Sequence, residues 1–422
     1  MATPTARQPL TTYRSVFADG QFRLLYGTSL LYGLGFTVEI LALSVLVFTR
    51  TRSPLLAALA FGIGFLPQVV GGALLVSLAD RWAPRTAITT GLLVRAVPGL
   101  TIGLLPDLPV AAMLALVAAA ATVAPVSGAA IAGLLPDLLD GDRYVLGRSV
   151  FGLTSSATQI VGLGVGGVVL GVLAPRQLLL VAGAALVVAG GAARVGLHHR
   201  PARARAAETR GVVRTSITGN AALLANARVR GLLLAQWLPA WFVTGAESLI
   251  VPYTGALGRP ASSGSVLLAA LPIGMLTGDL LVGRCLRPTT RERLAFPLAA
   301  ALGLPLLAFI LHPSLALAAG LLGLVGAGFG YALGIQRAFL DSLPSALRGQ
   351  AFGLSTTGLM GGQGLATPVA GVVAAILGVG PAMAVAGAAT LVAALALRPH
   401  LRPRRAVAPY AVRCGTWCPE RR

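Results

Sequence analysis

Long apolar segments separated by short polar loops run along nearly the whole chain. Each is roughly 20 residues long, the length at which an α-helix crosses the hydrocarbon of a bilayer, and a helix satisfies its own backbone hydrogen bonds there. The pattern predicts an all-α membrane protein with twelve transmembrane helices. The first six lie at about 24–48, 55–79, 86–105, 109–135, 149–173 and 177–197. The second six lie at about 231–255, 263–283, 294–311, 314–340, 350–377 and 380–397.

Polar segments divide the chain around these helices. An N-terminal arm covers residues 1–23, a basic linker covers 198–230 and a basic tail covers 398–422. Between them lie two six-helix halves, 24–197 and 231–397. Because the number of spans is even, both termini are expected on the same side of the membrane, together with the linker.

The composition fits a bilayer better than water as the solvent. Apolar residues make up 56 % of the chain and charged residues only 11 %, whereas about a quarter of an average soluble domain is charged. The net charge is nevertheless +20, and all 33 basic residues are arginine. Under the predicted topology 28 of them lie on the side of the termini, four lie opposite and Arg95 lies within a span. This bias follows the positive-inside rule, which predicts a bacterial inner-membrane protein with cytoplasmic termini and no nucleic-acid partner.

Residue groups that perform enzyme chemistry are not found in the sequence. All four histidines fall in loops or at span ends, and there is no nucleophile with a base, metal cluster or Walker-type loop. Gly162, Gly164 and Gly167 match the G-x-G-x-x-G pattern of dinucleotide sites. They lie in an apolar run without a βαβ unit, so we interpret them as helix-packing glycines. We expect no enzyme activity, no cofactor and no bound metal.

Three charged residues inside spans are the strongest candidates for function, because an ionisable group at a helix centre costs about 2.5–3.5 kcal/mol on insertion scales. Glu39 and Glu247 lie about sixteen residues into the first and seventh spans, 208 residues apart. Each could bind a cation or exchange a proton, or both are interfacial carboxylates hydrated by a wide cleft. Arg95 either turns inward to pair with an acid or an anionic solute, or snorkels and packs structurally.

Neutral polar and aromatic residues form a second group of candidates. Four glutamines in predicted spans could hydrogen-bond a solute or a neighbouring helix: Gln68, Gln159, Gln236 and Gln363. Trp237 and Trp241 are one helical turn apart and present one aromatic face. That face would suit an apolar or aromatic solute, or it serves ordinary helix packing.

The two halves resemble each other at an offset of about 200 residues. Arg148-Ser149-Val150-Phe151-Gly152-Leu153-Thr154 opens the fifth span, and Arg348-Gly349-Gln350-Ala351-Phe352-Gly353-Leu354-Ser355 opens the eleventh. Both segments follow a Leu-Pro turn. An internal repeat of this kind indicates two halves with the same helix arrangement.

The loop after the second span resembles the signature G-x-L-A-D-R-x-G-R-R/K of the major facilitator superfamily. Asp80, Arg81 and Arg85 match its acid and two of its basic residues, whereas two glycines and one basic residue are replaced. The resemblance covers nearly the whole chain. It implies two halves related as parallel repeats, a solute site near the midplane between them, first and seventh helices that line the cleft, and a cytoplasmic gate at Asp80, Arg81 and Arg85.

A narrower resemblance concerns the direction of transport. The segments Arg348–Gly353 and Gly361–Gly364 look like the branch of macrolide and siderophore exporters. That branch implies a monomer that exports a small amphipathic drug or metabolite in exchange for a proton or another cation. The G-P-x-x-G-G antiporter signature lacks its proline at 162–167, and the fourth span lacks a buried arginine. Nutrient uptake or facilitated diffusion, and a membrane sensor that does not transport, therefore stay as alternatives.

Overall fold

The regular secondary structure is all helical in a computed structural model that describes residues 13–75, 81–201, 218–343 and 347–401. Of these residues 88 % are helical and none lies in a strand. Among the described residues, ten helical segments are long and apolar enough to cross a membrane, and two of these segments contain a short break. The fifth and seventh expected spans correspond to two further helices, α8 (Gly141–Leu170), whose apolar part is Ala157–Leu170, and α11 (Ala227–Ser248).

The other helices fall into two groups along the chain. In the N half, residues 13–201, they are α1 (Tyr13–Phe17), α2 (Gly20–Thr51), α3 (Pro54–Gly62), α4 (Phe65–Leu74), α6 (Pro84–Leu104), α7 (Val110–Leu138) and α9 (Pro175–Gly196). In the C half, residues 218–401, they are α12 (Ile250–Ala256), α13 (Ala261–Leu280), α14 (Pro288–Leu307), α15 (Leu315–Gly328), α16 (Tyr331–Asp341), α17 (Arg348–Leu377), α18 (Val379–Ala396) and α19 (Arg398–Leu401). In the described part of the chain, three expected spans are each broken once: the second between α3 and α4, the seventh between α11 and α12, and the tenth between α15 and α16.

Local capping residues set where the helices of the first hairpin begin and end. The side chain of Asp19 accepts a hydrogen bond from the Phe22 N–H at 2.9 Å and caps α2. Arg52 ends this helix in the left-handed region at φ 53°. Ser53 then caps α3, and Pro54 occupies the first helical position, where no backbone donor is needed. The α2–α3 turn is therefore specified by adjacent residues.

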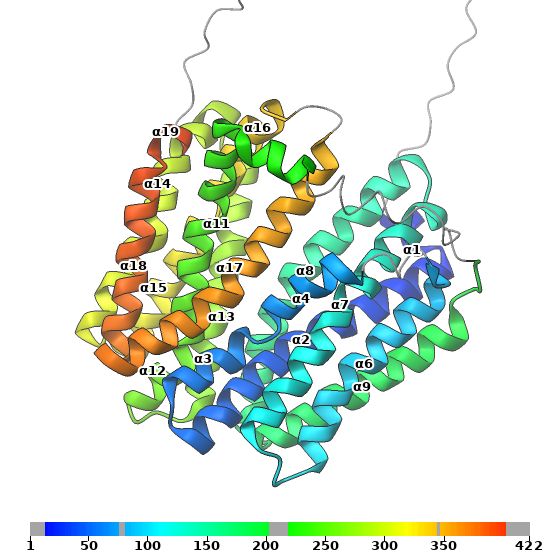
Figure 1. The fold of residues 1–422 in the computed structure, drawn as a ribbon, viewed down its shortest axis with the longest axis horizontal. Coiled ribbons are helices and arrows are strands. Elements are labelled where there is room, and N and C mark those ends of the chain that lie inside the picture. Colours follow the sequence, from blue (N-terminus) through cyan, green and yellow to red (C-terminus); the bar gives the residue numbers. More distant parts are fainter. Residues whose placement is uncertain (1–12, 76–80, 202–217, 344–346, 402–422) are drawn as a thin grey trace, which may run out of the picture.

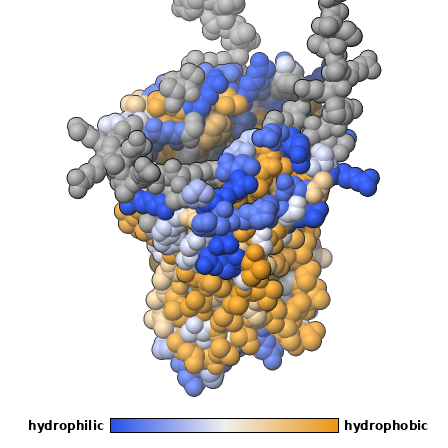
Figure 2. All heavy atoms as spheres, turned by 90° about the vertical axis from the view of Figure 1, so that its right-hand side faces the viewer, coloured by the Kyte–Doolittle hydropathy of each residue, from blue (hydrophilic) through white to orange (hydrophobic). Residues whose placement is uncertain are grey.

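The two halves converge at one end and diverge toward the other (Figure 1). They meet near α3 and α12, at what we call the closed end. They separate toward α1, α16 and α19, at what we call the terminal end, where the described chain begins and finishes. On the outer face of the N half the lower body is apolar, and hydrophilic residues gather toward the terminal end (Figure 2).

Small residues bring the halves together at the closed end. Helix α17 packs against α3 and α4, and α8 packs against α13. A Cβ added at Gly62 would overlap the side chain of Thr367, and one added at Gly167 would overlap Ser265. A Cβ at Gly371 would lie 2.8 Å from Leu55 Cα. Because any side chain at these glycines would collide across the junction, glycine is what permits the halves to close.

The interpretation of the fifth-span glycines as a packing surface is confirmed for Gly162 and Gly167, whereas a Cβ at Gly164 would meet no atom closer than 3.9 Å. A Cβ at Gly162 would lie 2.8 Å from the Thr37 Cβ, so α8 approaches α2 closely at this point. Gly167 fulfils the same role toward α13, as described above. Both glycines lie within one continuous helix, which is not the strand–turn–helix context of a dinucleotide site.

Gly326→Ala is expected to lower the thermal unfolding midpoint of the purified protein. The new Cβ would overlap the carbonyl oxygen of Leu271, so α15 and α13 would have to separate, and overpacking of this kind costs about 1–3 kcal/mol. Gly320→Ala is the matched control on the same helix, because no atom lies within 4 Å of its added Cβ. Equal midpoints for the two variants would contradict the close α13–α15 approach.

Candidate functional site

A buried ion pair joins α2 to α6 inside the N half. The Arg95 Nε lies 3.2 Å from the Glu39 Oε2, and the side chains are only 2 % and 4 % exposed. The guanidinium carbon of Arg95 also lies 4.9 Å from the centre of the Phe36 ring. Phe36 precedes Glu39 by three residues on α2, so both face the same side of the helix. One face of α2 thus supplies a carboxylate and an aromatic ring to the same arginine.

The hydrogen bonding of this pair is incomplete. Among the described residues, the buried Nε and Nη1 of Arg95 and the Oε1 of Glu39 have no hydrogen-bond partner. The 3.2 Å contact is therefore an ion pair without an aligned hydrogen bond. Buried charges are stable only when they are paired and hydrogen-bonded. The two Arg95 nitrogens need an acceptor and the Glu39 oxygen needs a donor, so a polar ligand or a water molecule could complete the hydrogen bonding of the pair.

Glu39 and Glu247 do not share one environment, although they occupy similar positions along corresponding helices. Glu39 is buried against Arg95. The alternative that it is an interfacial carboxylate hydrated by a wide cleft is therefore wrong for Glu39. Glu247, near the end of α11, is half-buried and forms no ion pair within the described part of the chain. Arg95 turns inward, as in the first of its two alternatives, and does not snorkel.

Two of the four glutamines connect α11 to α17. The Ser355 hydroxyl donates to the Gln236 Oε1 at 3.0 Å, and the Gln363 amide donates to the Thr244 hydroxyl at 2.9 Å. The Trp237 indole N–H donates to the Ser355 carbonyl at 2.8 Å. Gln236 and Thr244 are eight residues apart, about two turns of α11. The contacts fix α11 against α17 at both levels.

The remaining two glutamines lie in the N half. Gln68 donates its amide to the Gly64 carbonyl of its own helix at 2.9 Å, and the Gln159 side chain is exposed on α8. Within the described part of the chain, no hydrogen bond to the side-chain oxygen of Gln68 or Gln159 is found, whereas the Gln236 oxygen accepts from Ser355.

Trp237 and Trp241 stack on each other and pack on α17. Their ring centres are 5.9 Å apart and their planes are inclined by 10°. A Cβ added at Gly358 would overlap the Trp237 ring, and one added at Gly362 would overlap the Trp241 ring. Trp237 is buried, whereas Trp241 borders a surface cavity and its buried Nε1 has no hydrogen-bond partner within the described chain. Helix packing thus accounts for Trp237 but leaves one face of Trp241 open.

The structure describes only two of the three residues of the expected cytoplasmic gate. Asp80 lies outside the described residues. Arg81 is exposed and Arg85 is half-buried in the first turn of α6. The gate stays a prediction.

Phe36 was not singled out from the sequence, although it contacts the charged pair. A usable signal was present, because an aromatic residue three positions before a buried acid shares its helix face. Thr367 and Ser265 were also missed. Their importance depends on glycines in the other half, and no local pattern indicates which helices will meet.

Comparison with solved structures places the fold among transporters. The nucleoside transporter NupG matches with a TM-score of 0.72 and 14 % identity, over 92 % of this chain and 100 % of that one. A POT family transporter in complex with 5-aminolevulinic acid matches with 0.71 and 11 %, over 90 % and 96 %. An inward-facing bacterial homologue of the human lysosomal transporter Spinster matches with 0.68 and 14 %, over 93 % and 96 %. At these identities the likeness establishes the fold alone.

Sequence comparison identifies the family. No curated protein matches the chain at a significant level. The family model described as Major Facilitator Superfamily matches residues 25–344, about three quarters of the sequence. With its helical fold and its apolar spans, the chain belongs to the Major Facilitator Superfamily of membrane transporters.

Proposed function

We propose that this protein is a twelve-span secondary transporter of the bacterial inner membrane that exports a small amphipathic compound in exchange for protons. In this proposal α8 and α11 are the fifth and seventh spans, the halves are parallel repeats, the termini are cytoplasmic and the protein works as a monomer. The terminal end then faces the cytoplasm. The arrangement of the halves, joined at the closed end, corresponds to an inward-open state of alternating access.

The observation that carries proton coupling is the Glu39–Arg95 pair. It is buried in the N half, and several of its polar atoms lack hydrogen bonds among the described residues. When a proton neutralises Glu39, Arg95 loses its counter-charge and must find water or another acceptor. The α2–α6 contact therefore depends on protonation. Helix α2 also packs against α8 and α12, so a shift of α2 would reach the junction between the halves.

The solute would bind between the halves, where Glu247 is the candidate on α11. It forms no ion pair among the described residues, and such a carboxylate favours a cationic group. This feature fits an amphipathic cation. Export is supported by the resemblance of Arg348–Gly353 and Gly361–Gly364 to exporters.

Uptake of a nutrient is the second candidate. The structural likeness to a nucleoside transporter and to peptide-type POT transporters supports it. Uptake and export would use the same conformations and differ in the direction of net flux.

The proposal is tested with inverted vesicles that contain the protein. A panel of compounds is offered outside, and accumulation is measured with and without an imposed pH gradient, acid inside. Proton-coupled export predicts that at least one amphipathic cation accumulates only with the gradient. Entry of a nutrient that stops at equal concentrations inside and outside, with or without a gradient, would support facilitated diffusion. A protein that binds compounds without moving any of them would be a sensor.

Asp80→Asn is expected to slow transport and leave membrane insertion intact. As an acid at the predicted gate, Asp80 would pair with neighbouring helix ends when the cytoplasmic side closes, and the amide would weaken that pairing. Initial rates and membrane yield are compared with Asp107→Asn, which removes an exposed acid from the loop between α6 and α7 at the closed end. Unchanged turnover in Asp80→Asn would remove the gate assignment, and reduced insertion would indicate a role in topology.

A further inference from the structure

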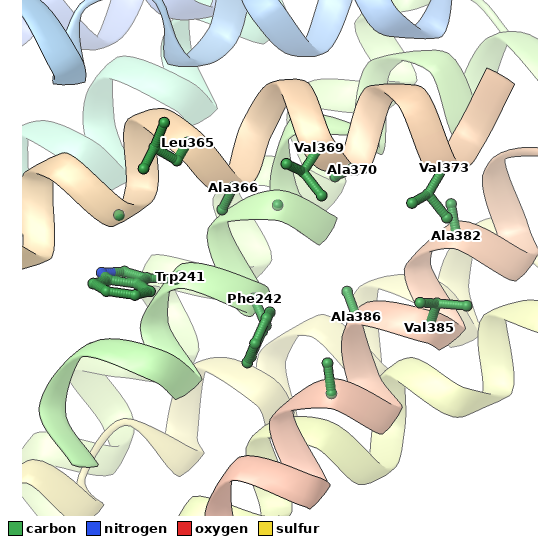
Figure 3. Close-up of a pocket in the computed structure, with 13 residues that line it drawn as sticks. Trp241, Phe242, Leu365, Ala366, Val369, Ala370, Val373, Ala382, Val385 and Ala386 are labelled. Carbon is green, nitrogen blue, oxygen red and sulfur yellow. The ribbon is translucent and has the colours of Figure 1, made fainter. Parts of the chain in front are cut away.

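An apolar groove runs along the C half between α17 and α18, with part of α11 at one end (Figure 3). Its volume is about 270 Å³, and every residue that lines it is aliphatic, aromatic or glycine. Trp241 lies at one end, and Val373 and Ala382 lie at the other. A groove with this lining can hold hydrocarbon but has no group that would bind the polar part of a solute.

The groove opens toward the bilayer. Its outer rim includes Leu365 and Val369 of α17, which are 58 % and 62 % exposed, and Val385 of α18, which is 45 % exposed. Helix α18 packs against α11, α14 and α17, which all belong to the C half. Both rim helices are among those apolar and long enough to cross a membrane. Exposed aliphatic side chains on such helices face lipid.

The length and depth of the groove match one leaflet. From Gly362 to Val373 the groove follows α17 for about 16 Å at a rise of 1.5 Å per residue, which is about half of the roughly 30 Å hydrocarbon thickness. Gly362 is near the middle of α17, and Val373 is in its last turns before Gly378. The Trp241 end therefore lies near the bilayer midplane, and the other end lies near the closed-end surface.

We propose that this groove binds one acyl chain of a phospholipid from the leaflet at the closed end. The chain enters beside the α17–α18 turn, and its terminal methyl group rests against Trp241. The headgroup stays outside, because the groove offers no polar partner to it. The inference needs only that the chain spans a membrane, and it holds whether the protein exports or imports its solute.

The test uses Trp241 as the reporter in reconstituted vesicles. Trp82, Trp237 and Trp417 are replaced by phenylalanine, and emission is recorded in phosphatidylcholine brominated either near the terminal methyl or near the ester. Bromine near the terminal methyl is expected to quench Trp241 more strongly. In the variant that keeps only Trp237, which is buried beside the same helix, quenching is expected to be weak at both bromine positions.

Two substitutions on α18 distinguish a chain in the groove from lipid that merely surrounds the protein. Ala386→Phe places a ring in the groove, whereas Ala388→Phe places the same ring on an exposed position of α18 that does not line it. Most of the Trp241 quenching is expected to disappear in Ala386→Phe and to persist in Ala388→Phe. Repeating this pair with all four tryptophans present gives a comparison that does not depend on the tryptophan replacements. Equal quenching in both α18 variants, or no dependence on bromine position, would overturn the proposal.

Discussion

Glu39→Gln is expected to abolish transport driven by a pH gradient, while binding of the solute stays measurable. Glutamine keeps the shape of the side chain but cannot exchange a proton or balance the charge of Arg95, which lies 3.2 Å away. Accumulation in vesicles with an imposed pH gradient measures coupling, and exchange of labelled solute at equal pH measures binding and movement without it. The first should be lost and the second retained.

Loss of function in this variant could also follow from instability, because a buried charge left without its partner costs about 3–5 kcal/mol. The double variant Glu39→Leu with Arg95→Leu separates the two causes. Replacing both members of a buried pair by apolar residues is often neutral or stabilising, so the double variant should fold and still lack pH-driven transport. Wild-type coupling in the double variant would show that this pair carries no proton.

Glu247→Gln makes the same chemical change at the half-buried carboxylate of α11 and serves as the comparison. Because Glu247 has no ion pair among the described residues, its replacement leaves no uncompensated arginine. We expect it to preserve pH coupling and to weaken transport of cationic solutes more than of neutral ones. If coupling is lost here and retained in Glu39→Gln, the roles of the two acids are reversed.

Gly62→Ala is expected to shift the protein away from the conformation described here. The added Cβ would overlap Thr367 across the junction of the halves, and the overlap disappears only when the closed end opens. Overpacking costs about 1–3 kcal/mol, so the ratio of the two conformations should change roughly 5- to 150-fold. Spin labels placed across each end report the shift, with longer distances at the closed end and shorter ones at the terminal end.

Two further variants control for effects unrelated to the junction. Thr367→Gly removes the side chain that the new Cβ would meet, so combining it with Gly62→Ala should restore the original distances. Gly191→Ala adds a methyl group to α9 where no atom lies within 4 Å, and its distances should equal those of the parent protein. If the distances in Gly62→Ala also equal those of the parent protein, the closed end does not depend on this contact.

The sequence predicts the helices well because their signal is local. An apolar run of sufficient length must become a helix in a bilayer, whatever its neighbours are. Breaks within the second and tenth spans were not predicted, since Gly64 and Gly330 lie in runs that remain apolar on both sides. These interruptions change the direction of a helix without changing the composition of the segment.

The candidate site could be predicted only in part. The cost of burying a charge singles out Glu39 and Arg95, but whether they meet depends on how α2 and α6 are rotated about their axes. The partners of Gln236 and Gln363 could not be predicted for the same reason. Their polarity inside a span indicates that each needs a partner, and only the packing of α11 on α17 shows that Ser355 and Thr244 fulfil that need.

The junction at the closed end joins glycines to neutral side chains such as Thr367, Ser265 and Leu55. Separating such contacts moves no charge along the membrane normal, so the transmembrane voltage, which acts at about 2.3 kcal/mol per elementary charge per 100 mV, does no work on them. Ionic strength has equally little effect on neutral contacts. Any voltage dependence of the transport cycle must then arise from the ions and solutes that move and from charged side chains such as Glu39, Arg95 and Glu247. The neutral contacts of the closed end add none of their own.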